Sequence, residues 1–193
     1  MIRGLWDVFS LGLDELGERI AREGFEVTVA RGRRWRQTAM LEADARSGGS
    51  HHGLLVVGGH SYGADNAVRF CRELETKGVN VDLLLLLDAT SPPPIPGNVR
   101  RCVHYYEPTV FGVLLPFALA GNPVQLADPN ARTELVNRRI SENWIVAATD
   151  VVTHFTVDAD QSVHQLCLGE IRRLKGRVET PTGSHVRRVQ AED

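Results

Sequence analysis

A serine in a glycine-flanked turn is the residue best suited to do chemistry in this chain. Residues 54–57 are apolar, the segment Gly59-His60-Ser61-Tyr62-Gly63 fits the pattern G-x-S-x-G, and a helical pattern begins directly after it. A hydroxyl presented at the end of a buried strand requires a strained backbone at the serine, and small neighbours let strand and helix approach each other. We therefore predict that Ser61 is a nucleophile. We also predict that the backbone N–H of Tyr62 points at the oxyanion formed on an attacked carbonyl.

A serine nucleophile also needs a base, and usually an acid that orients this base. With a turn of this kind, the acid is expected after the serine and before the histidine. Asp88 follows the apolar run 81–87, so it should lie at the same edge of a parallel sheet as Ser61, and we predict it to be the acid. Asp150 is the main alternative and Asp158 the third candidate. For Asp88 itself, the alternative role is to cap the turn before the prolines.

The base must be a histidine that can reach the serine. Four histidines follow Asp88. His104 lies inside a predicted strand and His164 on a predicted helix, so both are expected to pack, while His185 lies in a polar tail. His154 lies in the loop before the last helix, where a mobile base would be well placed, and it is predicted to be the general base.

Strands and helices are expected to alternate along the chain. This order predicts an α/β fold, a three-layer sandwich with a mostly parallel sheet of about five or six strands. Residues 2–6 are expected to hold the end of a short strand and the loop after it. Period-2 or continuous apolar runs predict strands at residues 25–30, 54–57, 81–87, 99–106 and 144–148. Helical periodicity predicts helices at residues 13–21, 37–45, 64–74 and 161–174.

Length and charge limit the classes of function. A chain of 193 residues is expected to form one domain over residues 1–176, with 108–143 as a candidate lid or pocket wall and 177–193 as a polar tail. The net charge of -2 indicates no general attraction to nucleic acid or membrane, and no stretch approaches the roughly 20 apolar residues of a membrane span. Because Met1-Ile2-Arg3-Gly4 begins no signal peptide, a cytoplasmic location is expected.

No cofactor or metal is expected. The glycines match neither nucleotide-binding pattern, and the neighbouring His51 and His52 would point in different directions on a strand. The three cysteines are widely spaced and are predicted to be reduced and buried. The basic segment 31–36 is interpreted as a solvated turn rather than a phosphate site.

The predicted triad of Ser61, Asp88 and His154 resembles that of the α/β-hydrolase superfamily. An acid one helix and one strand after the serine is similar to thioesterase domains of peptide and polyketide synthetases. The chain resembles small bacterial thioesterase-like or esterase-like hydrolases more closely, over most of residues 1–175. The segments that carry this resemblance are Arg3-Gly4-Leu5, Phe9-Ser10, Gly12-Leu13, the serine turn, Asp88, Pro92-Pro93-Pro94, Pro96, Asn98-Val99, Tyr105-Tyr106 and His154-Phe155.

The resemblance implies a minimal α/β-hydrolase fold and a two-step acyl transfer. The second oxyanion donor would be the backbone N–H of Leu5 or Trp6, although Trp6 could instead be a core or pocket-wall aromatic. The implied substrate is a small-molecule ester or acyl thioester, and the apolar segment 110–120 suggests an acyl or aromatic group or a homodimer interface. A non-catalytic binding module, and an acyltransferase or lactonase with the same triad, remain alternatives.

Overall fold

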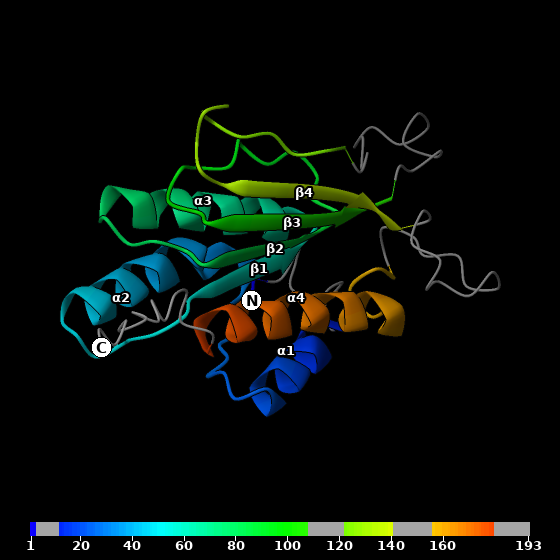
Figure 1. The fold of residues 1–193 in the computed structure, drawn as a ribbon, viewed down its shortest axis with the longest axis horizontal. Coiled ribbons are helices and arrows are strands. Elements are labelled where there is room, and N and C mark those ends of the chain that lie inside the picture. The colour runs from blue at the N-terminus through cyan, green and yellow to red at the C-terminus, as the bar shows by residue number, and fades with distance from the viewer. Residues whose placement is uncertain (3–11, 108–121, 141–155, 180–193) are drawn as a thin grey trace, which may run out of the picture.

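Parallel strands form the central sheet, four of them within the part of the chain that the structure describes (Figure 1). The computed structural model describes residues 1–2, 12–107, 122–140 and 156–179. Within them the strands are β1 (Val56–His60), β2 (Leu83–Leu87), β3 (Arg101–Tyr106) and β4 (Glu134–Arg139), in the order β1-β2-β3-β4. The helices are α1 (Gly12–Arg22), the 3₁₀ turn η2 (Gly32–Arg34), α2 (Trp35–Ser47), α3 (Tyr62–Thr76) and α4 (Gln161–Glu179).

Helices cover both faces of the sheet (Figure 1). β2 consists of five leucines, all buried, because a central parallel strand has no face open to water. Leu84 and Leu86 pack in one core with α2 and α3, while Leu83, Leu85 and Leu87 pack in a second core with α1 and α4. The predicted α/β sandwich is therefore confirmed for the part of the chain that the structure describes.

The sheet has fewer strands than the five or six expected, with four in the described residues. Ile2 forms single bridges to Gly59 and to Ala30, through bonds from the Ile2 N–H to Gly58 O (2.7 Å) and from the Ala30 N–H to Met1 O (2.8 Å). Residues 25–29 direct apolar side chains toward the core, but their backbone has no regular ladder partner among the described residues. The alternation of apolar and polar residues in this segment reflects side-chain burial without strand pairing. The strand predicted at 25–30 is therefore wrong.

The strand β4 was not predicted from the sequence. Its residues Glu-Leu-Val-Asn-Arg-Arg include only two apolar side chains, so the apolar pattern is weak. The strand forms because its backbone pairs with β3 from Arg101↔Glu134 to Tyr106↔Arg139. It also places part of segment 108–143 in the sheet itself. The strand predicted at 144–148 lies outside the described residues.

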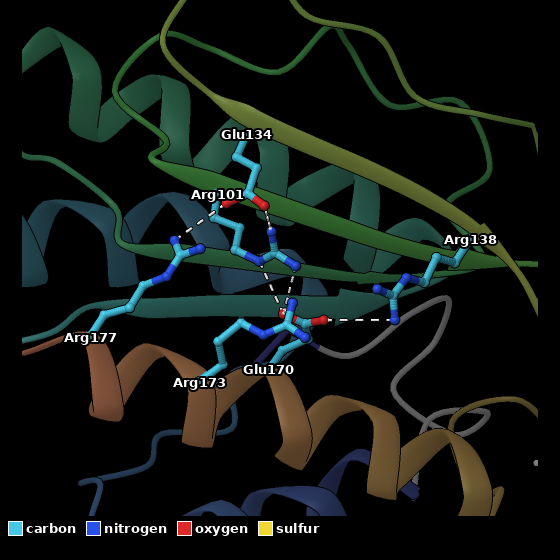
Figure 2. Close-up of polar contacts among 6 residues, drawn as sticks. All are labelled: Arg101, Glu134, Arg138, Glu170, Arg173 and Arg177. Atoms are coloured by element: carbon cyan, nitrogen blue, oxygen red, sulfur yellow. Dashed lines mark hydrogen bonds and ion pairs between the residues drawn. The ribbon is translucent and has the colours of Figure 1, made fainter.

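An ion-pair network joins β3 and β4 to α4 (Figure 2). The buried guanidinium of Arg101 donates to Glu170 Oε2 from Nε (3.0 Å) and Nη2 (2.8 Å), and it also pairs with Glu134. Arg138 and Arg173 lie 3.9 and 3.5 Å from the same Glu170 carboxylate. Two carboxylates, one on β4 and one on α4, thus tie these elements to Arg101 of β3.

The four predicted helices are all present. The last one, α4, continues to Glu179, beyond the expected start of the polar tail at residue 177. The cysteines Cys71, Cys102 and Cys167 are free and buried, as predicted. In the described ranges, no helix combines the length and the apolar character that crossing a bilayer would require.

Candidate active site

Ser61 occupies a strained turn between β1 and α3. Its φ is 56° and its ψ is -128°, a conformation that residues with a side chain rarely adopt. The Ser61 N–H donates to Leu87 O (2.9 Å), and the Ser61 carbonyl oxygen accepts the N–H groups of Ala64 (2.9 Å) and Asp65 (3.2 Å). The strained backbone predicted at this serine is confirmed.

Gly59 allows strand and helix to meet closely behind the serine. A Cβ added at Gly59 would lie 2.3 Å from Gly63 O and 2.8 Å from Ala64 N. Both contacts are with backbone, which cannot turn away as a flexible side chain would. The glycine in the first position of the pattern is therefore required for packing.

The start of α3 supplies a donor next to the serine. Tyr62 is the first residue of this helix, and the first N–H groups of an α-helix have no acceptor within the helix. The helix dipole adds partial positive charge at the same end. Ser61 is largely buried, at 7% exposure, whereas Tyr62 is 36% exposed. The N–H of Tyr62 thus has the local chemistry of an oxyanion donor.

Asp88 leaves the neighbouring strand at the same edge of the sheet. His60 and Leu87 are register partners in the parallel pair β1–β2, so Ser61 and Asp88 are the next residues along each strand. The side chain of Asp88 is buried, and its φ of 44° is also positive. Its N–H donates to Tyr105 O (2.8 Å), while its Oδ1 accepts the Glu107 N–H at 3.4 Å. The sequence prediction that Asp88 shares an edge with Ser61 is confirmed.

Buried side chains hold the turn that follows Asp88. His104 Nε2 accepts the Ala89 N–H at 3.1 Å, so this ring carries its proton on Nδ1. Burial lowers the pKa of His104 from 6.5 to about 4, and the nearby Asp88 carboxylate offsets part of that change. Asp65 on α3 accepts the next two backbone N–H groups, from Thr90 and Ser91. The expectation that His104 packs inside a strand is confirmed.

The structure adds Glu107 and Arg139 to this edge of the sheet. Glu107 follows β3 as Asp88 follows β2, and Arg139 is the last residue of β4. Arg139 Nε donates to Glu107 Oε1 at 3.3 Å. Sequence reasoning missed both residues. The position of Glu107 after an apolar run was a usable signal, whereas Arg139 required β4 to be known.

Asp158 is buried on the α1 and α4 side of the sheet. Its Oδ2 accepts the Gly12 N–H at 3.1 Å, and its Oδ1 lies 3.8 Å from His60 Nδ1. Its backbone oxygen accepts a bond from His164 Nε2 at 2.6 Å, which accounts for the packing expected of His164. Asp158 therefore fixes the beginning of α1 against the residue that precedes Ser61.

Several residues considered for the site, as predictions or as alternatives, lie outside the described residues. They are Leu5, Trp6, Asp150, His154 and His185. The structure thus brings Ser61, the Tyr62 N–H and Asp88 to one edge of the sheet. The base and the second oxyanion donor stay predictions.

Two further features concern ligands. A cavity of about 560 Å³ lies around the amino end of β1, with Glu42, Arg46 and His51 in its lining, and neither Ser61 nor Asp88 lines it. Over the described ranges, no group of three or more His, Cys, Asp or Glu side chains is arranged to hold a metal ion.

No protein-family model matches this chain, and no curated protein matches it significantly. One solved structure with some likeness is a candidate hydrolase of the α/β superfamily from Xanthomonas campestris pv. campestris, at 17% identity and a TM-score of 0.37. The alignment covers 87% of this chain and 96% of that one. A TM-score of this size does not establish a shared fold.

Proposed function

We propose that this protein is a serine hydrolase that cleaves carboxylic ester or thioester bonds. Ser61 is the nucleophile, His154 the general base and Asp88 the acid that orients it. The backbone N–H groups of Tyr62 and of Leu5 or Trp6 bind the oxyanion.

The observation that carries the proposal is the backbone of Ser61. A residue with a side chain held at φ 56° between a buried strand and a helix N-terminus stores strain that its surroundings must maintain. Such strain is characteristic of functional turns. Asp88, the proposed acid, follows the adjacent strand, so a nucleophile at Ser61 would have an acid at the same edge of the sheet.

The reaction follows from these roles. The Ser61 oxygen attacks the carbonyl carbon while His154 takes the hydroxyl proton, and the resulting oxyanion accepts bonds from the backbone donors. The protonated histidine then gives its proton to the departing alcohol or thiol, which leaves an acyl group on Ser61. Water deprotonated by His154 then attacks the acyl carbon, and as the bond to the Ser61 oxygen breaks, the histidine returns the proton to that oxygen and the carboxylic acid is released.

Turnover of short p-nitrophenyl esters and acyl-coenzyme A thioesters tests the proposal. Ser61→Ala should remove activity above the uncatalysed rate, whereas Ser91→Ala should retain it, because the exposed Ser91 side chain is not part of the proposed triad. Activity that survives Ser61→Ala would exclude this mechanism. Absence of turnover in the unaltered protein, with no labelling at Ser61, would favour the non-catalytic binding module.

The acid can be identified by a set of matched substitutions. Asp88→Asn should lower kcat by roughly 10³- to 10⁴-fold, the scale seen when a triad acid is removed. Asp150→Asn, Asp158→Asn and Glu107→Gln should each have a much smaller effect. A larger loss in any of these three than in Asp88→Asn would move the acid to that residue.

A further inference from the structure

We propose that Asp65 and His104 are positioning residues that hold Asp88 in place for the reaction. This inference rests on the proposed function, since it gives Asp88 the role of triad acid. Neither side chain is assigned a contact with substrate. Both would act through the backbone turn that presents the Asp88 carboxylate.

The turn is bound by side chains at three consecutive residues. The Ala89 N–H donates to His104 Nε2 at 3.1 Å. The Thr90 N–H donates to Asp65 Oδ1 at 3.0 Å, and the Ser91 N–H donates to Asp65 Oδ1 at 3.2 Å and Oδ2 at 3.0 Å. Residues 88–91 therefore follow β2 with every backbone N–H bonded.

These bonds hold Asp88 in its strained backbone conformation. A non-glycine residue at a φ of 44° persists only when the surrounding structure fixes it. Asp65 and His104 are suited to this task, because both are almost fully buried and water does not compete for their bonds. Without them, the turn would lose the acceptors that determine its path.

Asp65 also links the acid to the nucleophile. It lies in the first turn of α3, and its own N–H donates to the carbonyl oxygen of Ser61 at 3.2 Å. Its carboxylate reaches the residues just beyond Asp88. One side chain thus fixes the separation between the serine turn and the acid turn.

His104 reaches the same turn from the opposite direction. It is on β3, paired with Leu86 of β2, and its ring faces the turn with an unprotonated Nε2. The Asp88 carboxylate lies near the His104 ring, and Asn137 of β4 is the register partner of His104. Protonation of Nε2 would replace an acceptor with a donor opposite the Ala89 N–H.

Asp65→Asn is the first test. It keeps the size of the side chain but replaces one acceptor oxygen with an NH₂ group. We expect kcat for ester hydrolysis to fall by roughly 10- to 100-fold with KM little changed, because a misplaced catalytic group lowers the chemical step. The matched control is Asp82→Asn. Asp82 is a buried aspartate just before β2, at the other end of the sheet, and its Oδ2 accepts the Leu55 N–H at 2.8 Å.

A double-mutant cycle separates positioning from general loss of structure. In the Asp88→Asn background, Asp65→Asn should change kcat by less than about twofold, because its effect passes through Asp88. If the two losses multiply, Asp65 does not act through Asp88 and the inference is wrong. Equal losses of kcat in Asp65→Asn and Asp82→Asn would also overturn it.

Two substitutions of His104 test the role of its ring nitrogen as an acceptor. His104→Phe removes the acceptor and should lower kcat roughly 10-fold or more, whereas His104→Gln keeps an amide oxygen as acceptor and should recover much of the loss. Equal activity of the two variants would contradict a positioning role for the ring nitrogen.

Amide hydrogen exchange tests the turn without any need for activity. Exchange at Ser91, and to a lesser degree at Thr90, should accelerate in Asp65→Asn, because an NH₂ group replaces one of the two carboxylate oxygens that accept their N–H groups. Exchange at both should stay unchanged in Asp82→Asn. Unchanged exchange at both amides would overturn the inference even if the protein is an active serine hydrolase. Faster exchange in a protein whose Ser61 is inert would instead reject the proposed function, and with it the role of Asp88.

Discussion

The N–H of Ser61 donates to the carbonyl oxygen of Leu87 across 2.9 Å. This single bond continues the β1–β2 ladder for one residue beyond its last paired position, His60↔Leu87. Because Leu87 precedes Asp88, it fixes the proposed nucleophile and the proposed acid as neighbours at the carboxyl edge of the sheet. The proximity of these residues is therefore a consequence of strand register.

Gly59→Ala should disrupt this arrangement. The new methyl group would lie 2.3 Å from Gly63 O, so β1 and α3 would have to separate. We expect a loss of about 2 kcal/mol or more in the free energy of unfolding, measured by urea denaturation. Gly169→Ala is the control: it lies in α4 with nothing within 4 Å of the added atom, and it should stabilise the protein slightly. A destabilising Gly169→Ala with a neutral Gly59→Ala would contradict the packing argument.

Ser61→Gly should be more stable than Ser61→Ala. Glycine adopts a φ of 56° with ψ of -128° at little cost, whereas alanine keeps the strain of the native serine. The difference in free energy of unfolding is expected to be about 1 kcal/mol, after allowing for the greater flexibility of glycine in the unfolded chain. Both variants should be inactive. Equal stability would mean that the turn is not strained.

The turn at Ser61 and the position of Asp88 were predictable because each lies at the end of a strongly apolar run. In Leu83–Leu87 the leucines show where the strand ends, and hence where Asp88 begins a new segment. The features that the sequence did not predict depend on tertiary contacts. β4 has too few apolar residues to be recognised, and Phe25 and Val27 alternate toward the core without joining a ladder. Asp65 and His104 could not be assigned to the acid turn, because their contacts join segments 15–26 residues apart.

Stability should decrease in mild acid because of His104. The folded protein holds this ring neutral, with a pKa of about 4, while the unfolded chain binds a proton near pH 6.5. Between these values the unfolded state carries the extra proton, so the free energy of unfolding falls as pH falls. The total contribution is about 3 kcal/mol. The stability difference between the unaltered protein and His104→Gln, measured by urea denaturation, should shift by this amount between pH 7 and 4. A difference that does not vary with pH would show that the ring is not held neutral.

Glu170→Ala should destabilise the protein strongly. It would leave the buried Arg101 guanidinium without the carboxylate that accepts two of its bonds (Figure 2). We expect a loss of about 3–5 kcal/mol in the free energy of unfolding. The double variant Arg101→Met/Glu170→Leu should recover most of it. Glu18→Ala is the surface control, because Glu18 and Arg22 are both 72% exposed and their pair should contribute nothing measurable. A small effect of Glu170→Ala would mean that Glu134 or water compensates the Arg101 charge.

The nucleophilic role of Ser61 can be measured directly by covalent labelling. A serine-reactive phosphonate should add to the folded protein in a one-to-one ratio, as seen by intact mass, and peptide mapping should locate the adduct on Ser61 within segment 59–63. Labelling should disappear in Ser61→Ala and slow in Asp88→Asn. Stoichiometric labelling at any other residue, or none at Ser61 in the folded protein, would contradict the account.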